Sequence, residues 1–146
     1  MMKNPLFSKT IGWIILAGLV LLDVSLDLIF AQGKGLESPV WRPIAQLFGV
    51  HNPLFFTPLI LIIFYFVVKG GSWLTEKYDH IYVKTEELVL TTLVIIYGFF
   101  DLWLLLVYFF NFRLISNQFY LIPFLITIGI IYSWWAEKKL KNKRSK

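Results

Sequence analysis

Residues 11–31 read IGWIILAGLVLLDVSLDLIFA, an apolar run whose charged residues are Asp23 and Asp27. An α-helix rises about 1.5 Å per residue and the hydrocarbon core of a bilayer is about 30 Å thick, so about 20 apolar residues cross it. The run therefore predicts one membrane-spanning helix. It is too long for the core of a signal peptide, and no small-x-small cleavage site precedes the acids, so we expect it to be retained.

Three more apolar runs follow, at residues 53–68, 88–110 and 119–135. None alternates with a period of two, as the strands of a membrane barrel would. Of the 146 residues, 58% are hydrophobic and 16% are charged, whereas a soluble domain has about 25% charged residues. The sequence predicts an all-α integral membrane protein. We expect one domain, residues 1–136, that holds a bundle of four transmembrane helices, and a basic tail at 137–146.

The connection after the first run reads GKGLESPVWRPIAQLFGVHN, residues 33–52. Its apolar side chains have helical spacing, and they are Val40, Trp41, Ile44, Leu47 and Phe48. This spacing predicts a short amphipathic helix that lies at the membrane interface after the first span. The next connection, residues 69–87, mixes acids with lysines, and we expect a solvated inner loop there, with a helical turn that leads into the third span.

Lysine and arginine are distributed unevenly between the connections. With four spans, the two termini and the 69–87 connection share one side of the membrane and carry eleven of these residues. The other side carries only Lys34, Arg42 and Arg113. Because basic loops stay in the cytoplasm, we expect a multi-pass protein of the cell membrane with both termini cytoplasmic.

Asp23, Asp27 and Asp101 are the acids within the predicted spans. A charge at the centre of a span costs about 2.5–3.5 kcal/mol even on insertion scales, so such residues normally face protein or water. Asp23 and Asp27 are one helical turn apart and share a face. Counted along helices that run in the same direction, all three acids fall in one layer between the midplane and the outer interface. They would form one cluster if the first and third helices touch.

No Lys, Arg or His lies within the predicted spans to neutralise these acids. Three arrangements would do so: protonation, a shared cation, or a wet cavity open to the outside. Carboxylates without cysteine suit a hard cation such as Mg²⁺, Ca²⁺, Mn²⁺ or Na⁺. The alternative is structural, with each Asp hydrogen-bonded to a neighbour such as Thr57, Tyr65, Thr92 or Tyr97. Haem and iron–sulfur clusters are not expected, because the spans lack histidine and the chain lacks cysteine.

Two further groups of polar residues are candidate sites. The residues that would line an outer-face polar site are Glu37, Arg42, His51, Asn52 and Arg113. The tail residues that would bind anionic lipid headgroups are Lys138, Lys139, Lys141, Lys143 and Arg144. Each basic residue beside an anionic membrane contributes about 1 kcal/mol. The tail lacks interleaved aromatic residues, so we expect no nucleic-acid partner.

The chain carries no phosphate-binding loop, no His-Glu-x-x-His, no Gly-x-Ser-x-Gly and no cysteine pair. One pattern covers about residues 15–112: Asp23-x-x-x-Asp27, Gly33 or Gly35, Glu37-x-Pro39, a Pro-led second span and an Asn that closes the third. It resembles a group of small prokaryotic polytopic membrane proteins in which an Asp of the first span precedes a Gly…Glu-x-Asn-Pro segment. That group has no assigned activity, so the resemblance implies none.

These features favour a non-enzymatic membrane component, a small subunit that assembles with itself or with other membrane subunits. Little of the chain lies outside the bilayer, and no catalytic set is present. The first alternative is a transporter or channel component that binds a cation or a proton at Asp23, Asp27 and Asp101. The second is a membrane-embedded enzyme that modifies lipids at the outer-face polar site.

Overall fold

The computed structural model of the chain describes residues 6–38, 41–79, 84–111 and 118–144. Its elements are α1 (Lys9–Phe30), the 3-10 helix η1 (Lys34–Glu37), α2 (Arg42–Phe48), α3 (Pro53–Asp79), α4 (Thr85–Phe110) and α5 (Gln118–Arg144). Four of these helices, α1, α3, α4 and α5, are long and apolar enough to cross a membrane. The predicted all-α, four-span fold is confirmed, and the described residues form no strand.

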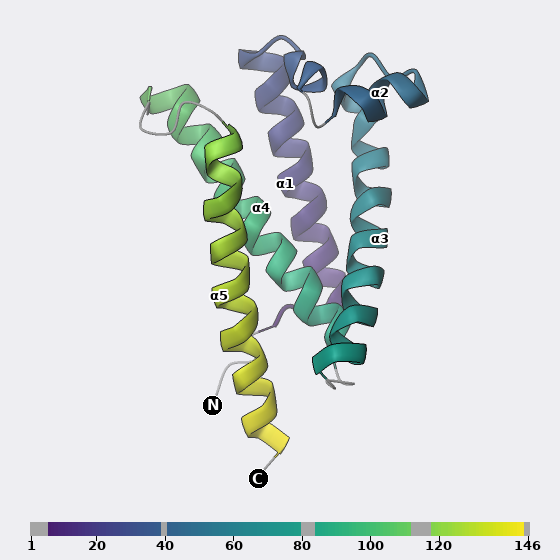
Figure 1. Cartoon of the computed structure of the whole chain (residues 1–146). Coiled ribbons are helices and arrows are strands. Elements are labelled where there is room, and N and C mark those ends of the chain that lie inside the picture. The colour runs from purple at the N-terminus through teal and green to yellow at the C-terminus, as the bar shows by residue number, and fades with distance from the viewer. Residues whose placement is uncertain (1–5, 39–40, 80–83, 112–117, 145–146) are drawn as a thin grey trace.

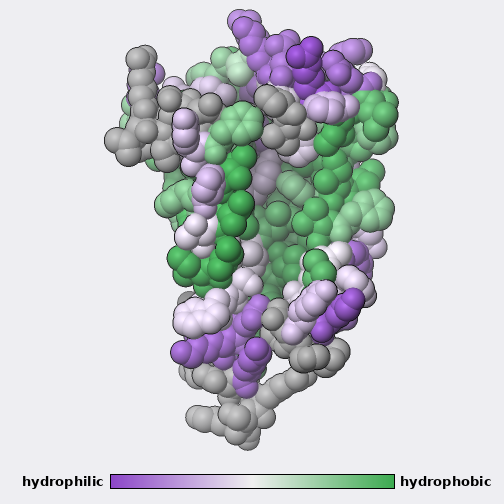
Figure 2. Space-filling model, viewed as in Figure 1, coloured by the Kyte–Doolittle hydropathy of each residue, from purple (hydrophilic) through white to green (hydrophobic). Residues whose placement is uncertain are grey.

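The surface has the polarity that a membrane-spanning bundle requires. Apolar side chains fill the middle of the face shown in Figure 2, and polar side chains gather at both of its ends. The start of α1 and the end of α5 lie at the same end of the bundle, as an even number of spans requires (Figure 1). We call this end, with Lys9, Lys69 and Lys138, the basic end. The opposite end, with η1 and α2, is the loop end.

Two of the predicted spans are longer helices than their apolar runs indicated. Helix α3 continues through Gly70 and Gly71 to Asp79, so the prediction of a loop over residues 69–87 was wrong for most of that segment. Gly71 lies within the helix at the point where α3 packs closely against Val89 of α4. Helix α5 continues to Arg144, so the basic tail is helical as far as that residue. Lysine and glutamate are good helix formers, and they extend α5 beyond its apolar part.

The predicted interfacial helix is confirmed as α2. It begins at Arg42, with a proline in its first turn, and ends before Gly49, which takes a left-handed φ of 63°. Leu47 and Phe48 of α2 are 80% and 59% exposed, whereas Ala45 is buried. Helix α2 therefore packs on the bundle through Ala45 and exposes Leu47 and Phe48, as an amphipathic helix at a membrane interface does.

Helix α4 is the centre of the bundle, because it contacts α1, α3 and α5, while α1 also contacts α3 (Figure 1). Each of the other spans approaches α4 at a glycine. These glycines and the α4 side chains that they meet are Gly12 with Leu90, Gly71 with Val89, and Gly129 with Ile96. A β-carbon added to any of the three would lie 2.5 to 2.9 Å from that side chain. Small residues let membrane helices approach closely, and here they set how the spans pack on α4.

Polar side chains join α1, α3 and α4 at the basic end. Glu86 of α4 pairs with Lys9 of α1 at 2.7 Å and also with Lys69 of α3. The Thr85 hydroxyl donates to Glu76 of α3 at 2.7 Å. The three helices are therefore linked by hydrogen bonds and ion pairs at this end, and the cavities described below lie nearer the loop end.

Candidate functional site

Asp23 of α1 and Tyr97 of α4 form a polar contact inside the bundle. The Tyr97 hydroxyl donates to Asp23 Oδ2 at 2.6 Å. Tyr97 is buried, and its ring meets Phe64 of α3 edge-to-face, with 5.4 Å between the centroids. This packing fixes the hydroxyl against the carboxylate. The structural alternative, in which an intramembrane Asp bonds to Tyr97, is confirmed for Asp23.

Asp101 lies one turn beyond Tyr97 on α4. Only 2% of its surface is exposed, and neither of its carboxyl oxygens has a hydrogen-bond partner among the described residues. It lies close enough to Asp23 and Tyr97 to interact with both electrostatically. Buried polar groups in native proteins nearly always have partners, so an exception of this kind requires an explanation.

Asp27 lies in the last turn of α1, at the loop end of the bundle. Its backbone carbonyl accepts from the N–H groups of Ala31 at 2.9 Å and Gly33 at 3.2 Å, and Gly33 has a left-handed φ of 79°. The chain therefore turns back over the helix end, and η1 comes to lie against Asp27. There the N–H of Gly35 donates to Asp27 Oδ1 at 2.9 Å. A β-carbon on Gly35 would lie 2.8 Å from the Asp27 carboxyl carbon, so only glycine allows this approach.

Replacing Gly35 with alanine is expected to separate η1 from Asp27, because the added methyl group would occupy the place of the carboxylate. Amide hydrogen exchange over residues 33–38 should then accelerate by roughly tenfold, which corresponds to one hydrogen bond to a charged group of about 1.5 kcal/mol. Gly18→Ala is the matched control, since a β-carbon on Gly18 meets no atom of the described residues within 4 Å. Equal exchange rates in the two variants would contradict the contact.

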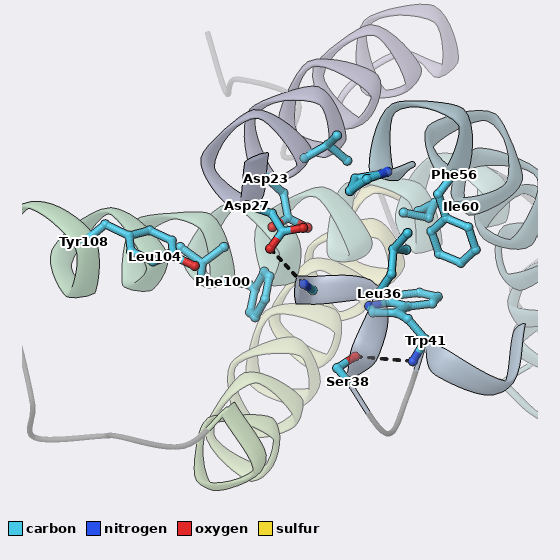
Figure 3. A pocket seen from close by; sticks show the side chains of 13 residues that line it. Asp23, Asp27, Leu36, Ser38, Trp41, Phe56, Ile60, Phe100, Leu104 and Tyr108 are labelled. Carbon is cyan, nitrogen blue, oxygen red and sulfur yellow. Dashed lines mark hydrogen bonds between the residues drawn. The ribbon is translucent and has the colours of Figure 1, made fainter. Parts of the chain in front are cut away.

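Asp23 and Asp27 line a cavity of about 110 Å³ near the loop end, which we call the acidic cavity. Aromatic rings form much of its wall, among them Trp41, Phe56 of α3 and Phe100 of α4. Figure 3 shows the two carboxylates directed into the cavity from α1, with Phe100 on one side and with Trp41 and Phe56 on the other. The rings of Trp41 and Phe56 stand at 79° to each other, with 5.6 Å between their centroids.

The three predicted acids gather in one region but do not form a metal-binding group. Asp23 interacts electrostatically with Asp27 and with Asp101. Within the part of the chain that the structure describes, no three His, Cys, Asp or Glu side chains are arranged to hold a metal ion. A hard divalent ion takes about six or more oxygen ligands. Among the described residues, these three acids are not arranged to supply such a set.

The outer-face polar residues separate into groups with different surroundings. Glu37, Arg42 and His51 line a second cavity of about 520 Å³ beside η1 and α2. Asn52 instead caps the start of α3, where its Oδ1 accepts from the N–H of Leu54 at 3.0 Å. Arg113 lies outside the described residues. Three of the five residues are therefore brought together.

The basic residues predicted to bind lipid headgroups lie in the last turns of α5 at the basic end: Lys138, Lys139, Lys141, Lys143 and Arg144. The ammonium group of Lys139 lies 4.0 Å from the ring centroid of Trp135, and that of Lys138 lies 5.4 Å from the ring centroid of Trp134. Tryptophan beside lysine is typical of the level of lipid headgroups. Headgroup binding itself stays a prediction.

The chain was compared with protein-family models, with curated proteins and with solved structures. None of the three comparisons finds a match. The resemblance to small prokaryotic membrane proteins with an Asp in the first span therefore stays a prediction.

Proposed function

We propose that this four-span membrane protein binds a proton at Asp101, Tyr97 and Asp23 and couples that proton to the movement of a cationic solute across the membrane. Three observations support the proposal: a buried carboxyl group that has no hydrogen-bond partner among the described residues, a tyrosine that joins two helices, and an acidic cavity that shares Asp23 with this cluster. We further propose that the basic end faces the cytoplasm, as the distribution of lysine and arginine predicts.

The observation that carries the proposal is the burial of Asp101. An ionised carboxylate taken out of water without a partner is destabilised far more than a neutral one. Both oxygens of Asp101 are buried and have no hydrogen-bond partner in the part of the chain that the structure describes, so a negative charge there would be uncompensated. A proton removes the charge and needs no ligand set. Asp101 is thus suited to hold a proton within a span, where ionisable residues commonly serve proton relays.

The position of Asp23 supports the coupling. Its carboxylate accepts from Tyr97 of α4 and also lines the acidic cavity, together with Asp27. A positive charge entering the cavity would meet the carboxylate that also interacts with Asp101. Binding of a cation and binding of a proton would therefore influence each other through Asp23, and such a coupling free energy acts equally in both directions.

The first test is infrared spectroscopy of the full-length protein in lipid at neutral pH. A protonated carboxylic acid has a carbonyl stretching band that an ionised carboxylate lacks. We expect this band in the parent protein, and we expect Asp101→Asn to remove it. Glu37→Gln is the matched control, because Glu37 is an exposed acid at the loop end. A band that survives in Asp101→Asn, or a parent protein without the band, would overturn the assignment of the proton to Asp101.

A further inference from the structure

A groove of about 270 Å³ adjoins the acidic cavity, and its surface is almost entirely apolar. We infer that the cavity and the groove together bind one cationic amphiphile, with its ammonium head in the acidic cavity and its apolar body in the groove. The inference rests on the proposed function and names the class of solute that the site would take. Three features support it: the acidic cavity is complementary in charge to an ammonium group, the walls of the groove are apolar, and several residues line both spaces.

The acidic cavity has the chemistry of an ammonium site. Asp23 and Asp27 each direct one oxygen to a hydrogen-bond donor of the protein, which leaves a second oxygen for a ligand. No Lys, Arg or His is among the described residues that line the cavity, so its charge is uncompensated. The near-perpendicular rings of Trp41 and Phe56 form two walls of an aromatic box. Carboxylates and aromatic faces together are how proteins recognise ammonium groups, including quaternary ones.

The size of the acidic cavity agrees with a small head group. Its volume of about 110 Å³ is somewhat below that of an engineered cavity of about 150 Å³ that holds a benzene ring. A methylated ammonium group fits this space, whereas a long chain does not. An amphiphile must therefore place its apolar part elsewhere.

The groove provides that place. Its apolar side chains come from three spans, and they include Phe64 of α3, Ile96 of α4 and Ile122 and Leu125 of α5. Figure 2 faces the region between α5 and α3, where apolar side chains border a recessed centre. An alkyl chain bound there would keep contact with apolar surface from the membrane into the protein.

The two spaces are joined at Asp23. Asp23, Ser38, Trp41 and Phe100 line both the acidic cavity and the groove. A ligand whose positive charge lies against Asp23 can therefore extend an apolar body along α4 toward α5 without a second entry route. A purely hydrophilic cation would leave the groove empty, and a neutral amphiphile would leave the two carboxylates without a counter-charge.

The test is saturable binding of radiolabelled dodecyltrimethylammonium to the full chain in phosphatidylcholine nanodiscs, with empty nanodiscs as the background. Three competitors separate the parts of the ligand: tetramethylammonium has the head alone, dodecanol the tail alone and dodecyl sulfate the opposite charge. We expect the unlabelled ammonium amphiphile to compete best. Trp41→Leu should weaken binding by about three- to thirty-fold, which is the range of one cation–π contact.

A matched pair of variants tests the groove. Ile122→Trp would fill the groove and should abolish binding. Ile126→Trp is the control and should leave binding unchanged. Ile126 lies one turn further along α5, is 53% exposed and does not line the groove. Equal binding by these two variants, or competition by dodecanol as strong as that by the ammonium amphiphile, would overturn the inference. Competition by tetramethylammonium as strong as that by the amphiphile would also overturn it, because the groove would then contribute nothing.

Failure of this inference can be told apart from failure of the proposed function. If the amphiphile does not bind but the infrared band depends on Asp101, the proton site stands and the class of solute is wrong. If the band is absent while dodecyltrimethylammonium binds through Asp23 and Ile122, the amphiphile site stands and the coupling to a proton is wrong.

Discussion

Liposomes that contain the Asp23→Asn protein are expected to show no uptake of a cationic amphiphile in response to a pH gradient, whereas liposomes with the parent protein take it up. Asp23 bonds to Tyr97, interacts with Asp101 and lines both the acidic cavity and the groove. Removing one partner of a buried charge pair costs about 2–5 kcal/mol. The affinity for dodecyltrimethylammonium should therefore fall about 30-fold or more.

Tyr97→Phe provides a graded comparison for this experiment. It removes the hydroxyl that donates to Asp23 but keeps the ring that packs on Phe64. One hydrogen bond to a charged group contributes about 1.5–3 kcal/mol, so uptake should be reduced but measurable. Uptake by Asp23→Asn at the parent rate, with parent dependence on the pH gradient, would remove Asp23 from the mechanism.

Replacing Gly129 with leucine is expected to destabilise the packing of α5 on α4 more than any surface change. A β-carbon at this position would lie 2.5 Å from Ile96 Cδ1, so the larger side chain forces the helices apart. Overpacking of this kind costs about 1–3 kcal/mol. Unfolding in increasing denaturing detergent, followed by tryptophan fluorescence, should shift to a lower detergent fraction. Binding of the amphiphile should weaken as well, because α5 forms one wall of the groove.

Gly70→Leu is the control for this substitution. Gly70 also lies within a membrane helix, but a β-carbon there meets nothing within 4 Å in the described part of the chain. Its unfolding should match that of the parent protein or shift to a slightly higher detergent fraction, because leucine has a higher helix propensity than glycine. Equal destabilisation by Gly70→Leu and Gly129→Leu would show that the close approach of α5 to α4 is not the cause.

The four spans and the interfacial helix could be predicted from the sequence because both depend on composition along one segment. The ends of α3 and α5 could not, because their last turns are polar and their helical state depends on contacts such as that of Gly71 with Val89. The layer that holds the three acids could be predicted from helix geometry alone. Which acid pairs with which donor could not, since helices that are apolar all round carry little information about their facing sides.

The site shows the same division. Asp23, Asp27 and Asp101 stand out in the sequence because charges are rare inside a membrane. The aromatic walls do not, because Trp41 and Phe56 look like ordinary membrane residues until α2 and η1 fold back over the bundle. The contact of Gly35 with Asp27 could not be predicted either, because the sequence shows only that Gly35 follows the first span.

It stays a prediction that this chain is a subunit of a larger complex. The mass of the intact complex in mild detergent would test it.

The hydrogen bond between Asp23 and Tyr97 also has a consequence for how the protein is made. Tyr97 follows Asp23 by 74 residues, and at about 5–20 residues per second the ribosome needs about 4 to 15 s to add them. During that interval α1 and then α3 enter the bilayer, while α4, the helix on which every other span packs, is still being synthesised. The nascent chain thus carries an unpartnered acid at membrane depth for seconds. We therefore expect the insertion machinery to shield Asp23 of the first span from lipid until α4 arrives.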